Sequence, residues 1–153
     1  ANPSASSVLF DLGCGDGRIC LEATKRFGCD SVGVEIEEHL ISKFNGLITA
    51  MGVGDKVTAR HEDLLETDLS KATIIVCYLL PDAIELIKPK LEDALRRGVV
   101  LVCNTWGPRG FRSVRTVQCG QLNASVNLHL FDHTSLPQDS DSVNSSVEGN
   151  INY

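Results

Sequence analysis

Short apolar runs alternate with helical patterns through the first two thirds of the chain. The apolar runs predict buried strands at 8–11, 31–35, 56–60, 73–78 and 99–103. Between them, apolar residues recur at the spacing of a helix face and predict helices over 18–27, 40–51 and 81–95. Gly28, Gly52 and Gly98 follow these helices as natural stops, and Pro89 predicts a kink in the third helix.

The alternation stops after residue 103. Residues 112–119 and 125–131 predict two antiparallel strands around the turn-like stretch Gly120-Gln121-Leu122-Asn123. The stretch 135–153 is rich in Ser, Asp and Asn and predicts a disordered tail, which leaves 1–134 as a single domain. Strand–helix alternation followed by a hairpin predicts a doubly wound α/β sheet, mostly parallel, with an antiparallel edge.

Composition narrows the function classes. The 153 residues carry a net charge of −6, which argues against nucleic acid as a partner held by bulk electrostatics. Residues 88–134 are locally basic, a pattern that favours a solvated face over a docking site for an acidic partner.

The six cysteines form no CxxC pair and sit mostly in apolar runs, so neither a metal site nor a disulfide framework is predicted. A reducing compartment is expected. The sequence has no apolar run of membrane-spanning length, and a cytoplasmic protein is predicted.

The glycine-rich stretch Gly13-Cys14-Gly15-Asp16-Gly17, between the first strand and the first helix, predicts a ligand cradle. Its spacing is GxGxG, and Arg18 stands where a dinucleotide-binding turn has its third glycine. Glu35 ends the second strand, 22 residues after Gly13, where a carboxylate accepts both hydroxyls of a ribose. Asp63, after the third strand, is a candidate acceptor for an adenine amino group, or equally a cap for the turn that follows.

Four motifs in order resemble those of the class I, seven-β-strand S-adenosylmethionine-dependent methyltransferases. They are Phe10–Gly17, Gly33-Val34-Glu35, Glu62-Asp63-Leu64 and Cys77–Pro81. The resemblance implies the strand order 3-2-1-4-5-7-6 and S-adenosyl-L-methionine as cofactor. It also implies cofactor contacts from these positions: Asp11, Gly13, Cys14, Gly15, Gly17, Glu35, Ile36, Glu62, Asp63 and Cys77.

Within the family, the Gly-Asp-Gly-Arg and Tyr-Leu-Leu-Pro segments resemble protein-lysine methyltransferases of the mitochondrial type. The resemblance therefore implies methyl transfer to a protein lysine, with Tyr78, Asp82 and Trp106 as candidate catalytic residues around the acceptor. Each has an alternative structural role, in the core, at the helix dipole or over the sheet edge. The fourth motif lacks the Asn-Pro-Pro-Tyr form typical of enzymes that act on nucleobase amines.

Two other functions stay open from the sequence: a small-molecule methyltransferase, and a non-catalytic cofactor-binding module that needs a partner chain. Family members usually carry a lid helix before the first strand, whereas only seven residues precede Val8 here. The mitochondrial-type enzymes also carry a membrane segment there. We therefore expect either a fragment, which would make a mitochondrial location possible, or a soluble relative.

Overall fold

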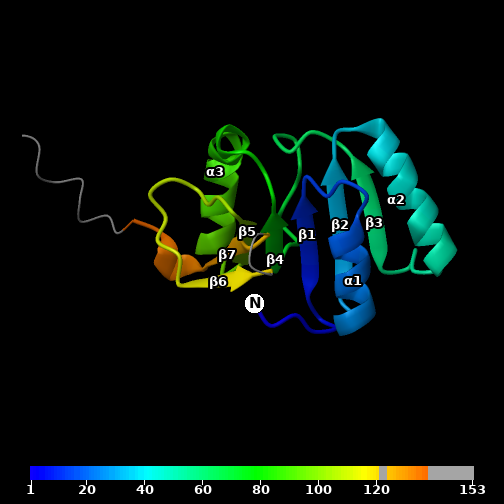
Figure 1. The fold of residues 1–153 in the computed structure, drawn as a ribbon, viewed down its shortest axis with the longest axis horizontal. Coiled ribbons are helices and arrows are strands. Elements are labelled where there is room, and N and C mark those ends of the chain that lie inside the picture. The colour runs from blue at the N-terminus through cyan, green and yellow to red at the C-terminus, as the bar shows by residue number, and fades with distance from the viewer. Residues whose placement is uncertain (121–123, 138–153) are drawn as a thin grey trace, which may run out of the picture.

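The structure is a computed structural model that describes residues 1–120 and 124–137. Seven strands form one sheet in the order β3-β2-β1-β4-β5-β7-β6, as predicted (Figure 1). The strands are β1 (Val8–Leu12), β2 (Asp30–Glu35), β3 (Val57–His61), β4 (Ile74–Cys77), β5 (Val100–Asn104), β6 (Arg115–Cys119) and β7 (Val126–Phe131). The helices are α1 (Arg18–Phe27), α2 (Glu38–Met51), α3 (Pro81–Arg96) and the short 3-10 helix η1 (His133–Ser135).

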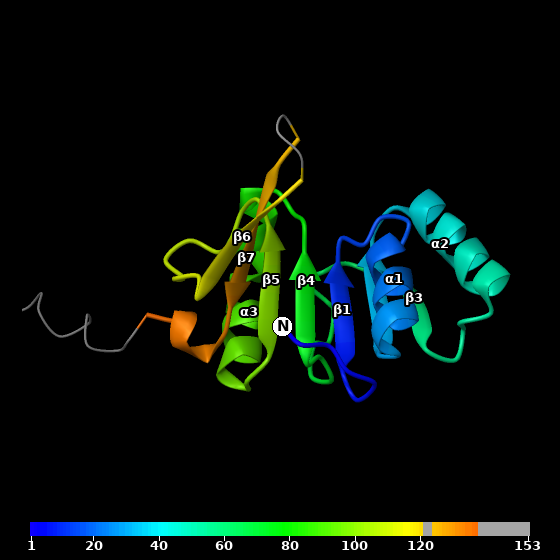
Figure 2. The ribbon, with the colours of Figure 1, turned by 60° about the horizontal axis from the view of Figure 1, so that its bottom comes forward.

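Strands β1 to β5 pair in parallel, whereas β7 runs antiparallel to both β5 and β6. The doubly wound α/β sheet with an antiparallel edge is therefore confirmed. Figure 2 shows the arrowheads of β1, β4 and β5 pointing to the same edge of the sheet. Loops that follow these strands consequently meet there, which is where ligands bind in open α/β sheets.

Most element ends lie within two residues of the prediction. Gly28 and Gly52 end α1 and α2 in the left-handed conformation, with φ of 68° and 65°. Helix α3 begins at Pro81 and continues through Pro89 to Arg96.

Two predicted boundaries at the end of the fold need correction. The stretch 112–114 is not part of a strand, since β6 begins only at Arg115, and the backbone N–H of Arg112 donates to the carbonyl of Ser135 at 2.9 Å. Ser135 itself is buried and ends η1, where its hydroxyl accepts from the N–H of Asp132, so the folded part extends past 134. The rest of the expected tail, 138–153, lies outside the described residues, as do 121–123 of the predicted turn.

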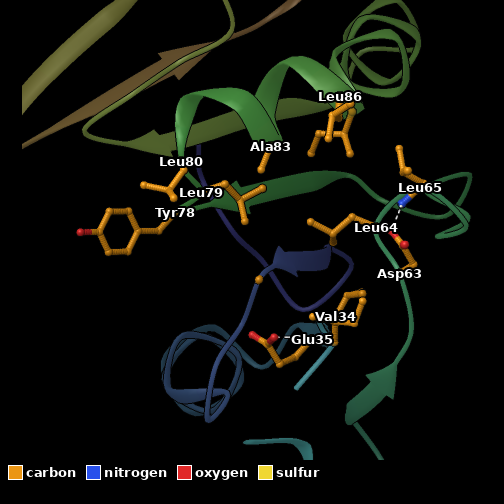
Figure 3. A pocket seen from close by; sticks show the side chains of 13 residues that line it. Val34, Glu35, Asp63, Leu64, Leu65, Tyr78, Leu79, Leu80, Ala83 and Leu86 are labelled. Carbon is orange, nitrogen blue, oxygen red and sulfur yellow. Dashed lines mark hydrogen bonds between the residues drawn. The ribbon is translucent and has the colours of Figure 1, made fainter. Parts of the chain in front are cut away.

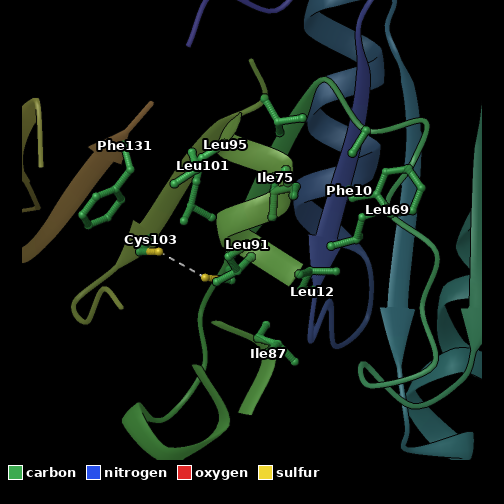
Figure 4. Packing of buried hydrophobic residues seen from close by; sticks show 14 of the residues in the cluster. Phe10, Leu12, Leu69, Ile75, Ile87, Leu91, Leu95, Leu101, Cys103 and Phe131 are labelled. Atoms are coloured by element: carbon green, nitrogen blue, oxygen red, sulfur yellow. Dashed lines mark hydrogen bonds between the residues drawn. The ribbon is translucent and has the colours of Figure 1, made fainter. Parts of the chain in front are cut away.

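The sheet separates two hydrophobic clusters. Figure 4 shows the cluster beneath α3, in which Ile75 and Leu101 of the strands pack against Leu91 of the helix. The cluster on the opposite face contains Ile74 and residues of α1 and α2. Neighbouring residues of β4 thus belong to different clusters, because successive side chains of a strand point to opposite faces. A strand buried on both faces needs a continuous apolar run, which is why these strands are visible in the sequence.

Phe44 of α2 packs against both the glycine turn and the sheet. Its fully buried ring occupies the space that a Cβ at Gly17 or Gly33 would need, at 2.1 Å and 2.6 Å from the nearest ring carbon. Gly17 also has a φ of 76°, which L-residues rarely adopt. Helices α1 and α2 can approach β2 closely only because both positions lack a side chain.

Among the described residues, no helix is both long enough and apolar enough to cross a membrane.

Gly33→Ala tests this packing without altering a left-handed residue. The added Cβ would meet Phe44 at 2.6 Å and the Cys14 thiol at 2.7 Å. We expect the free energy of unfolding to fall by about 1–3 kcal/mol, the usual cost of overpacking. Gly46→Ala in α2 is the matched control: a Cβ there meets nothing within 4 Å. It should raise stability by about 0.5–1 kcal/mol. Urea denaturation followed by circular dichroism measures both; equal stabilities would contradict the proposed packing.

Candidate active site

The glycine turn is built by three left-handed residues. Gly13, Gly15 and Gly17 have φ of 76°, 57° and 76°. The backbone N–H groups of Gly13 and Cys14 donate to the carbonyl of Val34 at 2.9 and 3.0 Å, which ties the turn to β2. A Cβ on Gly15 would meet no atom within 4 Å, so the turn exposes bare backbone to an open space. This is the geometry that lets a ligand approach the main chain.

Helix α1 starts directly after this turn, and its N-cap Gly17 supplies no side chain to satisfy the first N–H groups. Asp16 is engaged elsewhere: its carboxylate binds Arg18 and Lys43, each at 3.0 Å. These two cations hold the pKa of Asp16 well below its usual range. The helix terminus is therefore left to bind an external acceptor.

Glu35 closes the other side of the turn. Its Oε2 accepts from the Gly15 N–H at 3.0 Å, and its Oε1 accepts from the N–H groups of Ile36 and Glu37 at 2.8 and 3.1 Å. The carboxylate predicted at the end of the second strand is thus held beside the turn by three backbone donors. Such a fixed acceptor suits a diol.

Asp11 is the strongest sign of a ligand. Its side chain is 2% exposed, and Oδ2 has no hydrogen-bond partner among the described residues. Burial, with a smaller contribution from the negative charge of Glu35, raises the pKa of Asp11 to about 7. A buried carboxyl without a partner costs stability and is typical of a functional site.

A cavity of about 510 Å³ opens beside the turn, at the carboxyl ends of β1, β2 and β4 (Figure 3). Its size is that of a pocket for a ligand of ordinary cofactor dimensions. Five predicted residues line it: Gly13, Glu35, Ile36, Asp63 and Tyr78. The remaining lining residues are apolar: Val34, Leu64, Leu65, Leu79, Leu80, Ala83, Leu86 and Ile87.

Asp63 fulfils one of its two predicted roles and is positioned for the other. Its Oδ1 accepts from the Leu65 N–H at 2.8 Å, which caps the turn over 64–66. Asp63 also lines the cavity. Capping therefore orients this carboxylate at the rim of the cavity (Figure 3).

Two predicted cysteines point away from the cavity. The Cys14 thiol is buried in the cluster with α1 and α2, and burial raises its pKa to about 12. Cys77 is fully buried, with its sulfur 3.2 Å from that of Cys103. Both residues stay predicted cofactor contacts, with their backbones rather than their thiols available for such a role.

Three predicted carboxylates lie outside the cavity lining: Asp11, Glu62 and Asp82. Glu62 lies 3.6 Å from the Arg60 guanidinium and donates its backbone N–H to the carbonyl of Glu35 at 3.3 Å. Asp82 is exposed in the first turn of α3. Its position there favours the helix dipole, the alternative structural role predicted for it.

Tyr78 and Trp106 meet across the ends of β4 and β5. Their ring centroids lie 6.3 Å apart, with 12° between the planes. Both residues are substantially exposed, at 57% and 38%. Tyr78 lines the cavity and lies at one end of it in Figure 3. Trp106 is not among the lining residues, so the pair forms an aromatic surface that begins at that end of the cavity and extends beyond it. We call this pair the aromatic wall below.

The apolar lining is the part of the site that sequence reasoning missed. The helical pattern assigns Ala83 and Ile87 to a face packed in the core, and it gives Leu86 no role. In the structure all three line the cavity, although Leu86 is 67% exposed. The available signal in the sequence is that Leu86 lies between residues of the predicted core face and does not belong to that face. A leucine in such a position indicates an apolar surface patch.

Comparisons with known proteins agree with this site. Residues 11–115 match the family described as the ANTKMT methyltransferase domain. A protein-lysine N-methyltransferase of Saccharolobus islandicus is 35% identical over 85% of this chain and 83% of its own length. A crystal structure of an RNA methyltransferase from Salinibacter ruber, in complex with S-adenosyl-L-homocysteine, has a TM-score of 0.77 and 34% identity. The match covers 89% of this chain and 87% of that one.

A more distant structure shares the fold. The magnesium protoporphyrin IX methyltransferase of Synechocystis, with bound S-adenosylmethionine, has a TM-score of 0.65 at 15% identity. The match covers 84% of this chain and 69% of that one. At this identity the likeness concerns the fold alone.

The fold and the site define a class I methyltransferase, an enzyme that uses S-adenosylmethionine as its methyl donor. The chain belongs to the ANTKMT methyltransferase domain family. The glycine turn open at Gly15 and the unpartnered Asp11 oxygen fit this cofactor, which offers an ammonium group to such a carboxylate.

Asp11→Asn tests the cost of the buried carboxyl. In the folded protein the pKa of Asp11 is raised to about 7, so the folded state binds more protons than the unfolded state between pH 4 and 7. This contribution to stability is full below pH 4 and is lost as the pH rises toward 7, a loss of the order of 4 kcal/mol. The variant escapes this loss and should be more stable than wild type by about 1–3 kcal/mol at pH 8.

Denaturation of both proteins from pH 5 to 8 measures the difference. We expect the advantage of the variant to grow up to about pH 7 and then to level off. A difference independent of pH would show that Asp11 titrates near its ordinary value. Asp16→Asn is a control, because the pKa of Asp16 is shifted in the opposite direction.

Proposed function

We propose that this enzyme transfers the methyl group of S-adenosylmethionine to the ε-amine of a protein lysine. The observation that carries the proposal is the protein-lysine N-methyltransferase that is 35% identical over most of both chains. The cytoplasm remains the predicted compartment.

The donor half of the proposal concerns the cofactor. The Gly13–Gly17 backbone and Asp11 would hold the methionine part, Glu35 the ribose and Asp63 the adenine. In support, Glu35 and Asp63 line the same cavity, whose other walls are mainly apolar. The bound cofactor supplies a sulfonium-activated methyl group, so the protein mainly aligns the reactants and excludes water.

The acceptor half places the lysine at the aromatic wall formed by Tyr78 and Trp106. A lysine must lose a proton before its nitrogen attacks, and an environment that excludes water lowers the pKa of an amine. The ring faces would also attract the incoming ammonium group. Asp82 stays a predicted proton acceptor, although it does not line the cavity as Tyr78 does.

The related RNA methyltransferase suggests a second acceptor class. An RNA substrate binds chiefly through its phosphates, which need Lys or Arg side chains near the reacting base. Within the described part of the chain, no Lys or Arg lines the cavity, and the net charge of the whole sequence is −6. These features favour a cationic acceptor over RNA.

Glu35→Ala tests the donor half. The variant loses the hydrogen-bond acceptor for the ribose, so the Kd for S-adenosylmethionine should rise more than tenfold. Isothermal titration calorimetry measures this affinity. Glu37→Ala is the matched control, because this glutamate lies two residues away with its side chain exposed. An unchanged affinity in Glu35→Ala would reject the ribose assignment.

Transfer of tritiated methyl groups to cell extract tests the acceptor half. We expect label in protein, recovered as methyl-lysine by mass spectrometry of digests. The same extract with its lysines chemically acetylated should take up none, since an amide nitrogen is not nucleophilic. Total RNA and the small-molecule fraction are separate arms. Label confined to RNA or to small metabolites would overturn the lysine proposal and would identify the alternative acceptor.

A further inference from the structure

The loop over 105–111, between β5 and β6, carries Trp106 and begins with a residue in an unusual backbone conformation. Thr105 has a φ of 67° and is the sole residue other than glycine with a left-handed conformation in the described chain. The Trp106 N–H donates to the carbonyl of Asn104 at 2.8 Å, which closes a three-residue turn around Thr105. A β-branched residue persists in this conformation only where its surroundings impose it. The surroundings of this loop therefore determine where the indole points.

Helix α3 holds the loop at one residue. Glu85 Oε1 accepts from the backbone N–H of Arg109 at 2.8 Å, and Lys88 Nζ donates to the carbonyl of the same residue at 2.6 Å. Lys88 Nζ also lies 5.4 Å from the centre of the Phe111 ring. One helical turn thus satisfies both backbone polar groups of Arg109. We call Glu85 and Lys88 the α3 clamp.

Strand β7 supports the loop from the other side. The Thr105 N–H donates to the carbonyl of Asn127 at 2.7 Å. A Cβ on Gly107 would lie 2.5 Å from the ring of Phe131, so backbone and ring are already in contact. Phe111 meets the same ring edge-on at 6.3 Å. The loop is attached to β7 at its start and to α3 further along, with Trp106 between the two attachments.

The aromatic wall needs this support because its own rings are poorly packed. Trp106 is 38% exposed and Tyr78 is 57% exposed, and both lie outside the two buried clusters. Half-exposed rings have few neighbours to fix their orientation, so the near-parallel arrangement must come from the backbone that carries each ring.

We propose that Glu85 and Lys88 are positioning residues for methyl transfer: by clamping Arg109 they hold Trp106 against Tyr78 and keep the acceptor wall in place. The inference rests on the proposed function, because it assigns the wall to the acceptor. A misplaced wall should slow the chemical step and leave the cofactor in position.

Trp106 is the single tryptophan of the chain, so its fluorescence reports on the wall directly. Glu85→Ala and Lys88→Met should each shift the emission maximum and lower the anisotropy of Trp106. Both should reduce kcat for protein lysine about ten- to 100-fold, as expected for loss of one hydrogen bond to a charged group. The Kd for S-adenosylmethionine should stay within about twofold of wild type.

Two controls separate positioning from general stability. In Glu85→Gln the side chain still has an oxygen that accepts from Arg109, so fluorescence and kcat should return close to wild type. Lys90→Met removes the other α3 lysine that donates to a loop carbonyl, that of Thr67 at 2.9 Å. It lies on the side of α3 that contacts the 67–70 loop, and the emission of Trp106 should not change.

Trp106 fluorescence that is unchanged in both clamp variants would overturn the inference. Altered fluorescence with an unchanged kcat would overturn it as well, since the wall would then not govern transfer. If wild type labels no protein lysine while Trp106 responds to the clamp variants, the proposed function fails, and with it the assignment of the wall to the acceptor. Should Glu85→Ala not fold, Lys88→Met decides the question alone.

Discussion

Close packing between a phenylalanine ring and two glycines holds the cofactor cradle together. Phe44 occupies the positions that side chains at Gly17 and Gly33 would take. The contact brings α2, the start of α1 and the middle of β2 together at one point. The turn between Gly13 and Gly17 can present bare backbone because Phe44 packs against it, so the turn needs no side chains of its own for support.

The cofactor site also contains a carboxyl group whose burial costs stability in the folded chain. Asp11 is buried on β1, and one of its oxygens has no partner among the described residues. Burial and the negative charge of Glu35 both disfavour its ionisation. Apolar residues could fill this space at lower cost. The Asp11 carboxylate would therefore be stabilised by a cation, and a ligand with an ammonium group supplies one.

Much of the fold is predictable from sequence because strands covered on both faces must be apolar throughout. Residues 73–78 stand out for that reason, and glycines mark the helix ends. The strand order comes from the family resemblance rather than from pattern. The cradle is also predictable, since left-handed turns and a strand-ending carboxylate such as Glu35 leave a signal in residue type.

The side-chain directions are harder to predict. Cys77 is a predicted cofactor contact, yet its thiol faces Cys103, because the two-residue period of a strand says which residues share a face and not which face meets the ligand. Leu64 and Leu86 escape prediction as cavity residues, since a leucine that lines a cavity has the same hydropathy as one that fills a core. Residues 112–114 have the composition of a strand although β6 begins only at Arg115, because composition does not reveal that the Arg112 N–H bonds to the carbonyl of Ser135.

Helix α3 contacts two loops, one with each half of its length. Its first half holds the loop over 105–111 through Glu85 and Lys88. Its second half holds the loop before β4, where Lys90 donates to the carbonyl of Thr67 and Arg97 donates to the carbonyls of 69 and 70. Pro89 lies between these two sets of hydrogen bonds and has no N–H to donate to the carbonyl four residues earlier. One helix thus fixes two separate loops, and the missing backbone hydrogen bond at Pro89 lies between its contacts with them.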